Sequence, residues 1–279
     1  MLWLLGGCDQ LFQIHEVGSS STDPDASTGP VNATCPPIGS GPPTFGLELH
    51  ELFPRECYRY TTSEDGSLAS AMCSDTAVFS LEQGPVGGPL VPITISPQPS
   101  NETIIYDWLA PEGDLLVAKQ HDLDSTSVLT HRIATYEKNG AGWTFRNEVF
   151  ADTNFATAGV PSRGPNRRVF VTQVYGASYR ELEQQGDTWV VKHMGMWTEF
   201  GLPNGGIASS SQLSPDGLRL VFMNNYDVNY TDRPSLDAPW STPVKLEGLA
   251  SVNDPFLTAN CGRIYFSANN AVFFREQAQ

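Results

Sequence analysis

The chain has 279 residues and a formal net charge of −15, from 31 acidic and 16 basic side chains. This charge argues against a nucleic-acid partner and against electrostatic adhesion to anionic lipid, because both need a concentrated positive field. Charged residues make up only 17% of the chain. The abundance of small polar residues, Gly and Pro suits strands and turns better than exposed helices. We interpret the acidity as a solubility feature of an exported protein.

The first eight residues read Met-Leu-Trp-Leu-Leu-Gly-Gly-Cys, and Leu5 to Cys8 resemble the bacterial lipobox, whose cysteine is acylated. Signal peptides have roughly 15–30 residues and a positive start. Here seven residues precede Cys8 and none is Lys or Arg. Either the true start lies upstream or the match is accidental. We expect residues 1–8 to be a truncated signal and Cys8 to be the site of lipid attachment.

Residues 9–43 are predicted to form a tether. From Gly18 to Pro43 the chain is rich in Ser, Thr, Pro and Gly and has hardly any large apolar side chain. Such a stretch buries too little surface to offset its ordering entropy, so we expect it to be flexible. No stretch approaches the roughly 20 apolar residues of a membrane helix. The lipid would therefore be the only membrane link, in the bacterial cell envelope, on the outer-membrane, periplasmic or surface side.

Residues 44–279 contain an internal repeat in which a turn precedes a short apolar run. The centres of the runs are residues 69, 116, 170, 221 and 265, in steps of 47, 54, 51 and 44. Propeller blades recur at about 40–50 residues. Asp-Gly turns indicate hairpins, and a continuous apolar run suits a strand that is buried on both faces. The runs are Leu68–Ser70, Leu115–Val117, Val169–Val171, Leu220–Phe222 and Ile264–Phe266.

The fifth copy of the repeat stops at Gln279, before a fourth strand. Residues 41–52 align without gaps with residues 238–249, which hold the fourth strand of the previous copy. We therefore predict an all-β propeller of five blades, each of four antiparallel strands, closed by residues 44–52. A closed ring leaves only short sheet edges. The alternatives are six blades or a β-sandwich.

Three tryptophans recur in the predicted outer strands, at Trp143, Trp197 and Trp240. They could act as stacking platforms for sugars. Their repeated position favours packing within or between blades.

One copy of the repeat resembles a known family. Leu213 to Phe222, with Ser214-Pro215-Asp216-Gly217, resembles the WD40-like repeat of TolB-type propellers, and Asp254-Pro255-Phe256 resembles that repeat's opening. The whole is similar to propeller lipoproteins of bacteria such as myxobacteria. The resemblance spans residues 44–279, but the other copies depart from the consensus at the Asp-Gly. It implies a fold, an exported setting and, for most members, a binding role, and it transfers no catalytic residue.

The four cysteines besides Cys8 can form two disulfides in an oxidising compartment. Cys57 and Cys73 flank the Asp65-Gly66 turn and face each other across a three-residue loop, within reach of a disulfide. Cys35 is then left to join Cys261. The alternative is buried free thiols.

Motifs for a metal site, a nucleophile or a phosphate-binding loop are absent from the sequence, so we expect neither a metal nor another cofactor. Glu56, Asp107 and Asp254 lie in or just before predicted innermost strands of three blades. They are weak catalytic candidates, because five-bladed glycosidases use carboxylates at the channel mouth. Structural roles are the stronger interpretation. With Trp108, Asp107 and Asp254 are also candidates for ligand binding.

The predicted function is that of a monomeric, non-enzymatic propeller lipoprotein that binds a protein or a carbohydrate at the cell envelope. The alternatives are a five-bladed carbohydrate-active enzyme and a surface structural protein without a specific ligand.

Overall fold

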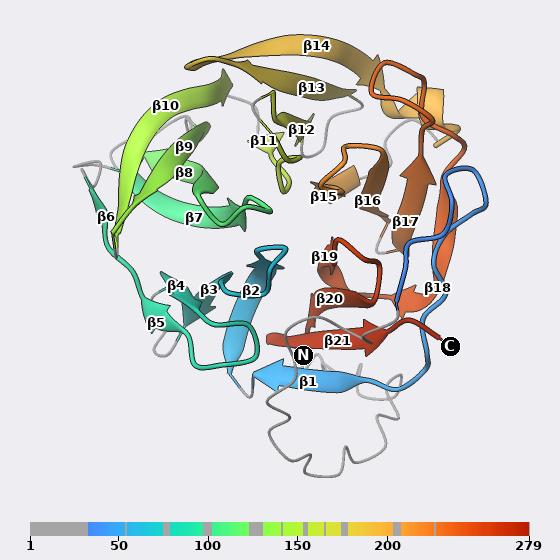
Figure 1. The fold of residues 1–279 in the computed structure, drawn as a ribbon, viewed down its shortest axis with the longest axis horizontal. Coiled ribbons are helices and arrows are strands. Elements are labelled where there is room, and N and C mark those ends of the chain that lie inside the picture. Colours follow the sequence, from blue (N-terminus) through green and yellow to red (C-terminus); the bar gives the residue numbers. More distant parts are fainter. Residues whose placement is uncertain are drawn as a thin grey trace, which may run out of the picture.

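The computed structural model shows a five-bladed β-propeller, in which five sheets surround a central axis (Figure 1). The predicted attachment site at Cys8 and most of the predicted tether lie outside the residues that it describes. Those residues are 33–278, apart from 54, 75–78, 97–101, 123–130, 141, 153–155, 165, 174–177, 203–207 and 226.

The innermost strand of each blade faces the central axis. These strands are β2 (Glu56–Thr62), β7 (Glu102–Leu109), β11 (Ala156–Thr157), β15 (Ala208–Leu213) and β19 (Asn253–Leu257). All three acidic candidates of the sequence lie in innermost strands, Glu56 in β2, Asp107 in β7 and Asp254 in β19.

The second strand of each blade carries the apolar run of the repeat. Val117, Phe170, Phe222 and Tyr265 are among its fully buried side chains. Successive side chains of a strand point to opposite faces, so these strands must be covered on both faces by neighbouring blades. The second strands are β3 (Ala69–Ser74), β8 (Leu115–Asp122), β12 (Arg168–Gln173), β16 (Arg219–Asn224) and β20 (Arg263–Ala268).

The third and outer strands complete each sheet. The third strands are β4 (Phe79–Gly84), β9 (His131–Asn139), β13 (Ser178–Gln185), β17 (Asp227–Asp232) and β21 (Ala271–Glu276). The outer strands are β5 (Val91–Pro92), β10 (Gly142–Asp152), β14 (Thr188–Met196), β18 (Val244–Ala250) and β1 (His50–Phe53). A short strand, β6 (Ile95–Ser96), pairs in parallel with β10, and a 3-10 helix, η1 (Trp197–Phe200), follows β14.

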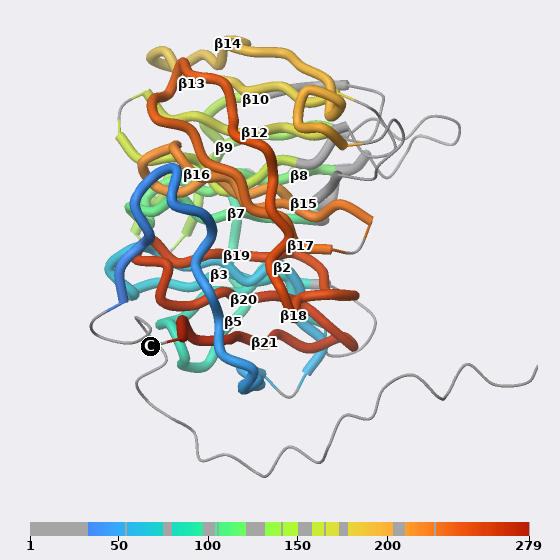
Figure 2. The backbone as a smooth tube through the Cα atoms, turned by 90° about the vertical axis from the view of Figure 1, so that its right-hand side faces the viewer, coloured from blue at the N-terminus to red at the C-terminus, as the bar shows by residue number. Residues whose placement is uncertain are grey.

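The last blade is completed by the amino-terminal strand, as predicted. Strand β1 pairs antiparallel with β21, with His50 opposite Phe274. Before it, the backbone N–H of Gly46 donates to the carbonyl oxygen of Glu276 at 2.9 Å. Figure 2 shows the amino-terminal segment in blue, crossing the side of the ring to reach β21. The ring therefore has no open edge between its first and last blades.

Two disulfides join the expected cysteines, Cys57 to Cys73 and Cys35 to Cys261. The second holds the segment before β1 to the last blade. In addition, Arg219 donates to the carbonyl oxygen of Pro36 at 2.9 Å, so residues 33–43, assigned to the tether, contact the propeller.

The loop in the first hairpin is longer than predicted. It closes between Ser63 and Leu68, around four residues and not three, which shifts the register by one residue. A bulge between Tyr58 and Thr61 shifts it back. Cys57 therefore still lies opposite Cys73, as the disulfide requires.

Two of the three tryptophans were wrongly assigned to outer strands. Trp143 lies in β10, but Trp197 lies in η1 and Trp240 lies in the connection from β17 to β18. Pro239 and Pro243 flank Trp240 and lack the N–H that a strand ladder needs. Trp197 stacks on Phe222 of the neighbouring blade, with ring centroids 5.2 Å apart, and is buried there.

The turns between innermost and second strands, here called the inner turns, share one construction. The first residue donates its backbone N–H to the carbonyl of the last, at 2.8–3.0 Å in all five blades. In four blades the first residue is Ser or Thr, and its hydroxyl accepts the N–H of the last residue; these residues are Ser63, Ser162, Ser214 and Thr258. This bond explains the Ser of the Ser-Pro-Asp-Gly motif.

Candidate functional site

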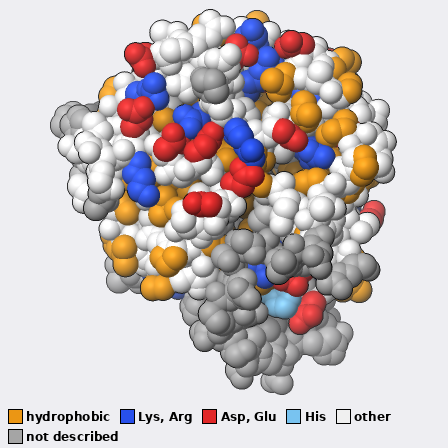
Figure 3. All heavy atoms as spheres, in the orientation of Figure 1, with side chains coloured by type: hydrophobic (Ala, Val, Ile, Leu, Met, Phe, Trp, Pro, Cys, Tyr) orange, Lys and Arg blue, Asp and Glu red, His pale blue; other side chains and the backbone are white. Residues whose placement is uncertain are grey.

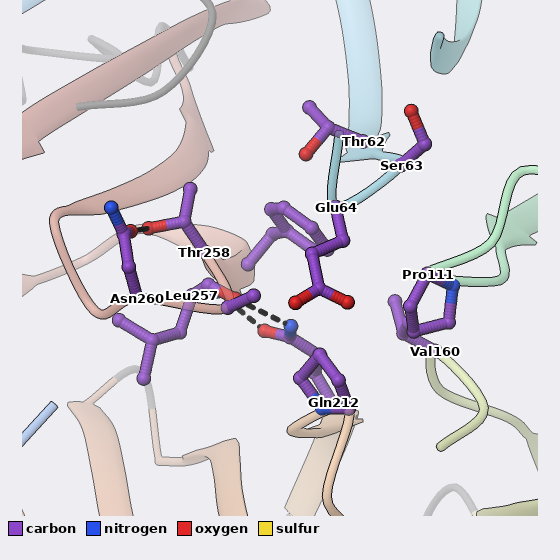
Figure 4. A pocket seen from close by; sticks show the side chains of 12 residues that line it. Thr62, Ser63, Glu64, Pro111, Val160, Gln212, Leu257, Thr258 and Asn260 are labelled. Atoms are coloured by element: carbon purple, nitrogen blue, oxygen red, sulfur yellow. Dashed lines mark hydrogen bonds between the residues drawn. The ribbon is translucent and has the colours of Figure 1, made fainter. Parts of the chain in front are cut away.

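A cavity of about 250 Å³ lies at one end of the central axis, among the inner turns (Figure 4). We call it the mouth pocket. All five blades contribute to its wall, which consists of Thr62, Ser63, Glu64, Pro111, Val160, Gln212, Pro215, Phe256, Leu257, Thr258, Ala259 and Asn260.

The inner turns around the mouth pocket are bonded to one another. The backbone N–H of Glu64 donates to Pro111 at 2.7 Å, and that of Arg163 donates to Pro215 at 2.7 Å. The carboxylate of Glu64 forms an ion pair with Arg163. On the face of the ring that Figure 3 shows, acidic and basic side chains gather near the centre. These contacts hold the rim of the pocket in place before a ligand arrives.

The mouth pocket combines polar groups with apolar surface. Of its lining side chains only Glu64 carries a charge, and Figure 4 shows its carboxylate directed into the pocket. The Gln212 amide bridges two blades, because it donates to the carbonyl of Leu257 at 2.8 Å and accepts that residue's N–H. Phe256 and the prolines supply apolar contact. A ligand would meet the carboxylate of Glu64, which is paired with Arg163, several hydroxyls and a mostly neutral wall.

Below the mouth pocket, the innermost strands bulge at similar positions. The registers of β2, β7, β15 and β19 against their neighbours each shift once. Three residues at these shifts, Arg59, Ser210 and Asp254, have positive φ of 55°, 50° and 51°. A bulge re-aims a side chain, and positive φ in such residues is strained and clusters at functional sites.

The bulges bring these three side chains together. Arg59 lies 3.2 Å from Asp254 in an ion pair, and the Ser210 hydroxyl donates to the same carboxylate oxygen at 2.7 Å. The Arg59 guanidinium also lies 3.7 Å from the ring centroid of Tyr106 and 5.2 Å from that of Trp108. The cavity beside this cluster measures about 10 Å³, so it holds about one water molecule.

Asp107 is buried completely beside this cluster. Its Oδ2 accepts the hydroxyl of Ser70, while its Oδ1 has no hydrogen-bond partner among the described residues. Gln83 donates to Ser70 at 3.3 Å and accepts the indole N–H of Trp143 at 2.8 Å. Burial raises the pKa of Asp107 to about 7, against the smaller opposing effects of Ser70 and Arg59.

The structure thus places two of the three predicted carboxylates beside Arg59 and the third elsewhere. Glu56 accepts the hydroxyl of Tyr58 at 2.6 Å, at the opposite end of β2 from the mouth pocket. Burial is the main cause that raises the pKa of Tyr58 to about 12, and the neighbouring Glu56 carboxylate is the second. Trp108 is 4% exposed, so it packs and offers no open face for stacking.

Sequence reasoning missed Arg59 and the mouth pocket. In the segment Glu56–Thr62, Arg59 is a single basic residue, and strict alternation does not reveal that a bulge turns it inward. The turn residues that line the mouth pocket were read as hairpin signals. Their recurrence in five blades was the available signal that they meet around one axis.

In the described part of the chain, no three His, Cys, Asp or Glu side chains are grouped to hold a metal ion. No helix among the described residues is long and apolar enough to cross a membrane.

The fold and the mouth pocket define the class of protein, a five-bladed β-propeller with an axial pocket. No family model and no curated protein matches the chain. It is similar to the solved structure of TolB from Acinetobacter baumannii, at 12% identity over 81% of this chain and 55% of that chain, with a TM-score of 0.49. It is also similar to regucalcin, a calcium-binding protein from Agrobacterium tumefaciens, at 10% identity over 85% and 97% of the two chains, with a TM-score of 0.49.

An oligogalacturonate lyase in complex with manganese is similar at 11% identity over 91% of this chain and 99% of the other, with a TM-score of 0.45. The chain spans 55–65% of the length of the first three solved structures that it matches. At such identities the similarity concerns the fold alone.

Proposed function

We propose that this protein is a non-enzymatic binding module that takes its ligand at the mouth pocket. The observation that carries the proposal is the convergence of the inner turns of all five blades, four of them bonded to one another, around one cavity of about 250 Å³. The two carboxylates below the mouth pocket do not face it: Asp254 pairs with Arg59, and Asp107 is completely buried. A glycosidase needs two carboxyl groups that flank the substrate, and in retaining enzymes they lie only about 5–5.5 Å apart.

The lining favours an extended protein segment with a basic side chain as the ligand. Glu64 supplies one carboxylate, which a basic side chain would share with Arg163. Phe256 and the prolines supply apolar surface, and Thr62 and Ser63 supply hydroxyls. The net charge of −15 also attracts a basic partner at long range.

The protein acts at the bacterial cell envelope as an exported monomer, held there by a lipid on Cys8. Two disulfides support an oxidising compartment, and the acidic composition supports an exported protein. Metabolic labelling with palmitate tests the anchor. The chain with a complete bacterial signal peptide placed before Leu5 should incorporate label in a bacterial host, and the same chain with Cys8→Ser should not. Equal labelling of both would contradict the lipid anchor.

Selection from a phage-displayed library of 12-residue peptides tests the binding role. We expect basic peptides to be selected and Glu64→Gln to weaken their binding at least fivefold in calorimetric titration. Glu64 pairs with an exposed Arg163, so its replacement should cost little stability. Glu247→Gln, on the exposed side of β18, is the matched control and should change affinity less than twofold.

Two results would overturn the proposal. One is a selected peptide that binds the Glu64→Gln variant as tightly as the unaltered protein. The other is turnover of a polysaccharide by the purified protein that Asp254→Asn abolishes, which would favour the glycosidase alternative.

A further inference from the structure

A second and larger cavity, of about 380 Å³, lies between the third and fourth blades, away from the central axis. We call it the interblade pocket. Strands β13 and β14 and the helix η1 line one side of it. The connection from β17 to β18 lines the other, through Leu236 to Trp240. Pockets of this volume hold small organic ligands.

A buried network of charges forms part of the lining. Glu181 is 1% exposed and accepts two hydrogen bonds from Arg233, at 2.7 and 2.8 Å, and one from Arg168 at 3.1 Å. Arg168 also donates to the carbonyl of Leu236 at 2.7 Å and to Asp237 at 3.0 Å. Arg168 also bonds Glu183, which pairs with Lys192 at 3.4 Å. Two arginines and one lysine thus face three carboxylates, and this part of the wall is close to neutral.

Because this network is balanced, it offers no unpaired charge to select an ion. Its arginines also tie the connection from β17 to β18 to the third blade, which holds the two sides of the pocket in a fixed relation. A preformed pocket loses less entropy when it binds a ligand.

Aromatic surface lines the pocket beside this network. Trp240 is partly exposed there, and the Arg233 guanidinium lies 4.1 Å from its ring centroid. The indole Nε1 of Trp240 has no hydrogen-bond acceptor among the described residues. Tyr179 and Phe200 also line the pocket, with ring centroids 5.2 Å apart. That nitrogen is buried, so a ligand can reach the exposed part of the Trp240 ring but not its N–H.

Polar groups complete the lining. The Tyr179 hydroxyl donates to Glu199 at 3.1 Å and lies 3.1 Å from Nε2 of His193. His193 and Glu199 are half exposed, at 53% and 51%. The backbone N–H of Met196 donates to Glu199 and holds its pKa below the usual range, so this acceptor stays ionised at neutral pH. Donors and acceptors therefore stand side by side.

We propose that the interblade pocket binds a neutral sugar, one or two units in length. Hydroxyl groups need both donors and acceptors, which Lys192, His193 and Glu199 supply from the lining. The C–H face of a sugar ring needs aromatic surface, which the partly exposed ring of Trp240 supplies. A phosphate or a carboxylate would meet Glu181, Glu199 and Asp237, while both arginines and Lys192 are already paired with carboxylates. This site is separate from the mouth pocket and does not depend on the binding role proposed for it.

A glycan array of neutral mono- to tetrasaccharides built from glucose, galactose, mannose and N-acetylglucosamine provides the first test. The best glycan is then titrated calorimetrically against the full chain. We expect Trp240→Ala to weaken binding at least tenfold and His193→Ala threefold or more. Phe145→Ala removes an aromatic of 40% exposure on the second blade and should change affinity less than twofold.

Two further measurements keep the test decisive. Near-ultraviolet circular dichroism shows whether Trp240→Ala folds; if it does not, the half-exposed His193→Ala carries the comparison. Glu64→Gln should leave sugar affinity unchanged, which separates this pocket from the mouth pocket. The proposal is wrong if no neutral glycan binds saturably, or if both variants keep full affinity.

Discussion

Replacing Asp107 by Asn should make the stability of the propeller less sensitive to pH. Asp107 is completely buried, and burial raises the pKa of its carboxyl from 3.8 to about 7. Asn has the same shape and can still accept the Ser70 hydroxyl, but it never ionises. The substitution therefore removes a buried charge and little packing.

The sign follows from proton binding in the two states. Below about pH 4 the carboxyl is protonated whether the chain is folded or unfolded. As pH rises to about 7, the unfolded chain ionises first, so the folded state progressively loses stability relative to it. Each pKa unit corresponds to about 1.36 kcal/mol, so the loss above pH 7 approaches about 4 kcal/mol.

The assay is guanidinium-induced unfolding of both proteins between pH 4 and pH 8, followed by tryptophan fluorescence. The two free energies of unfolding should agree within about 1 kcal/mol at pH 4, and Asp107→Asn should be the more stable protein at pH 8. Asp65→Asn is a control of opposite sign, because the Ser63 hydroxyl lowers the pKa of Asp65 and its removal should cost stability above pH 4. A difference between Asp107→Asn and the unaltered protein that does not change with pH would refute the reasoning.

Three other variants test the architecture. Cys35→Ala with Cys261→Ala opens a loop of 226 residues and should lower the free energy of unfolding by up to about 5 kcal/mol in chemical unfolding. Removal of the hairpin disulfide, whose loop is 16 residues, should lower it by about 3 kcal/mol. The reverse order would contradict the closure. Asp254→Asn leaves the buried Arg59 without its carboxylate and should lower the free energy of unfolding by about 3 kcal/mol. The double variant with Arg59→Met should recover part of that loss. Additive effects of the two substitutions would count against the ion pair. Ser214→Ala removes the hydroxyl that closes an inner turn and should lower the free energy of unfolding by about 1 kcal/mol; no change would mean that this bond contributes nothing.

The blades were predictable because their signals are local and repeated. The apolar run that centres on Val221 is flanked by Asp-Gly, and both features depend on neighbours in the chain. Even the closure was predictable, since residues 44–52 keep the pattern of a fourth strand. The disulfide between Cys57 and Cys73 was predicted correctly although two local features were missed, because a longer turn and a bulge at Arg59 shift the register in opposite directions.

The site was less predictable because it depends on contacts between blades. Arg59 reaches the axis only because a bulge reverses its direction, and Asp254 meets it from another blade. Trp240 was placed in a strand because Trp240-Ser241 resembles the Trp-Thr pairs at Trp143 and Trp197, but Pro239 and Pro243 prevent ladder bonds there. The interblade pocket forms from a connection whose position is held by Arg168 of the preceding blade. Neither the spacing of residues nor the composition of the chain shows such contacts between blades.

The shared last blade also sets the order in which the molecule can be assembled. As the chain is synthesised from its amino end, β1 has no partner until β21 is available, so ring closure has to come last. Before its own β1 has paired, the free edge of β21 can accept β1 from a second molecule, which would give a strand-swapped dimer. Refolding at high protein concentration should therefore yield swapped dimers, and oxidation of Cys35 with a neighbour's Cys261 would trap them.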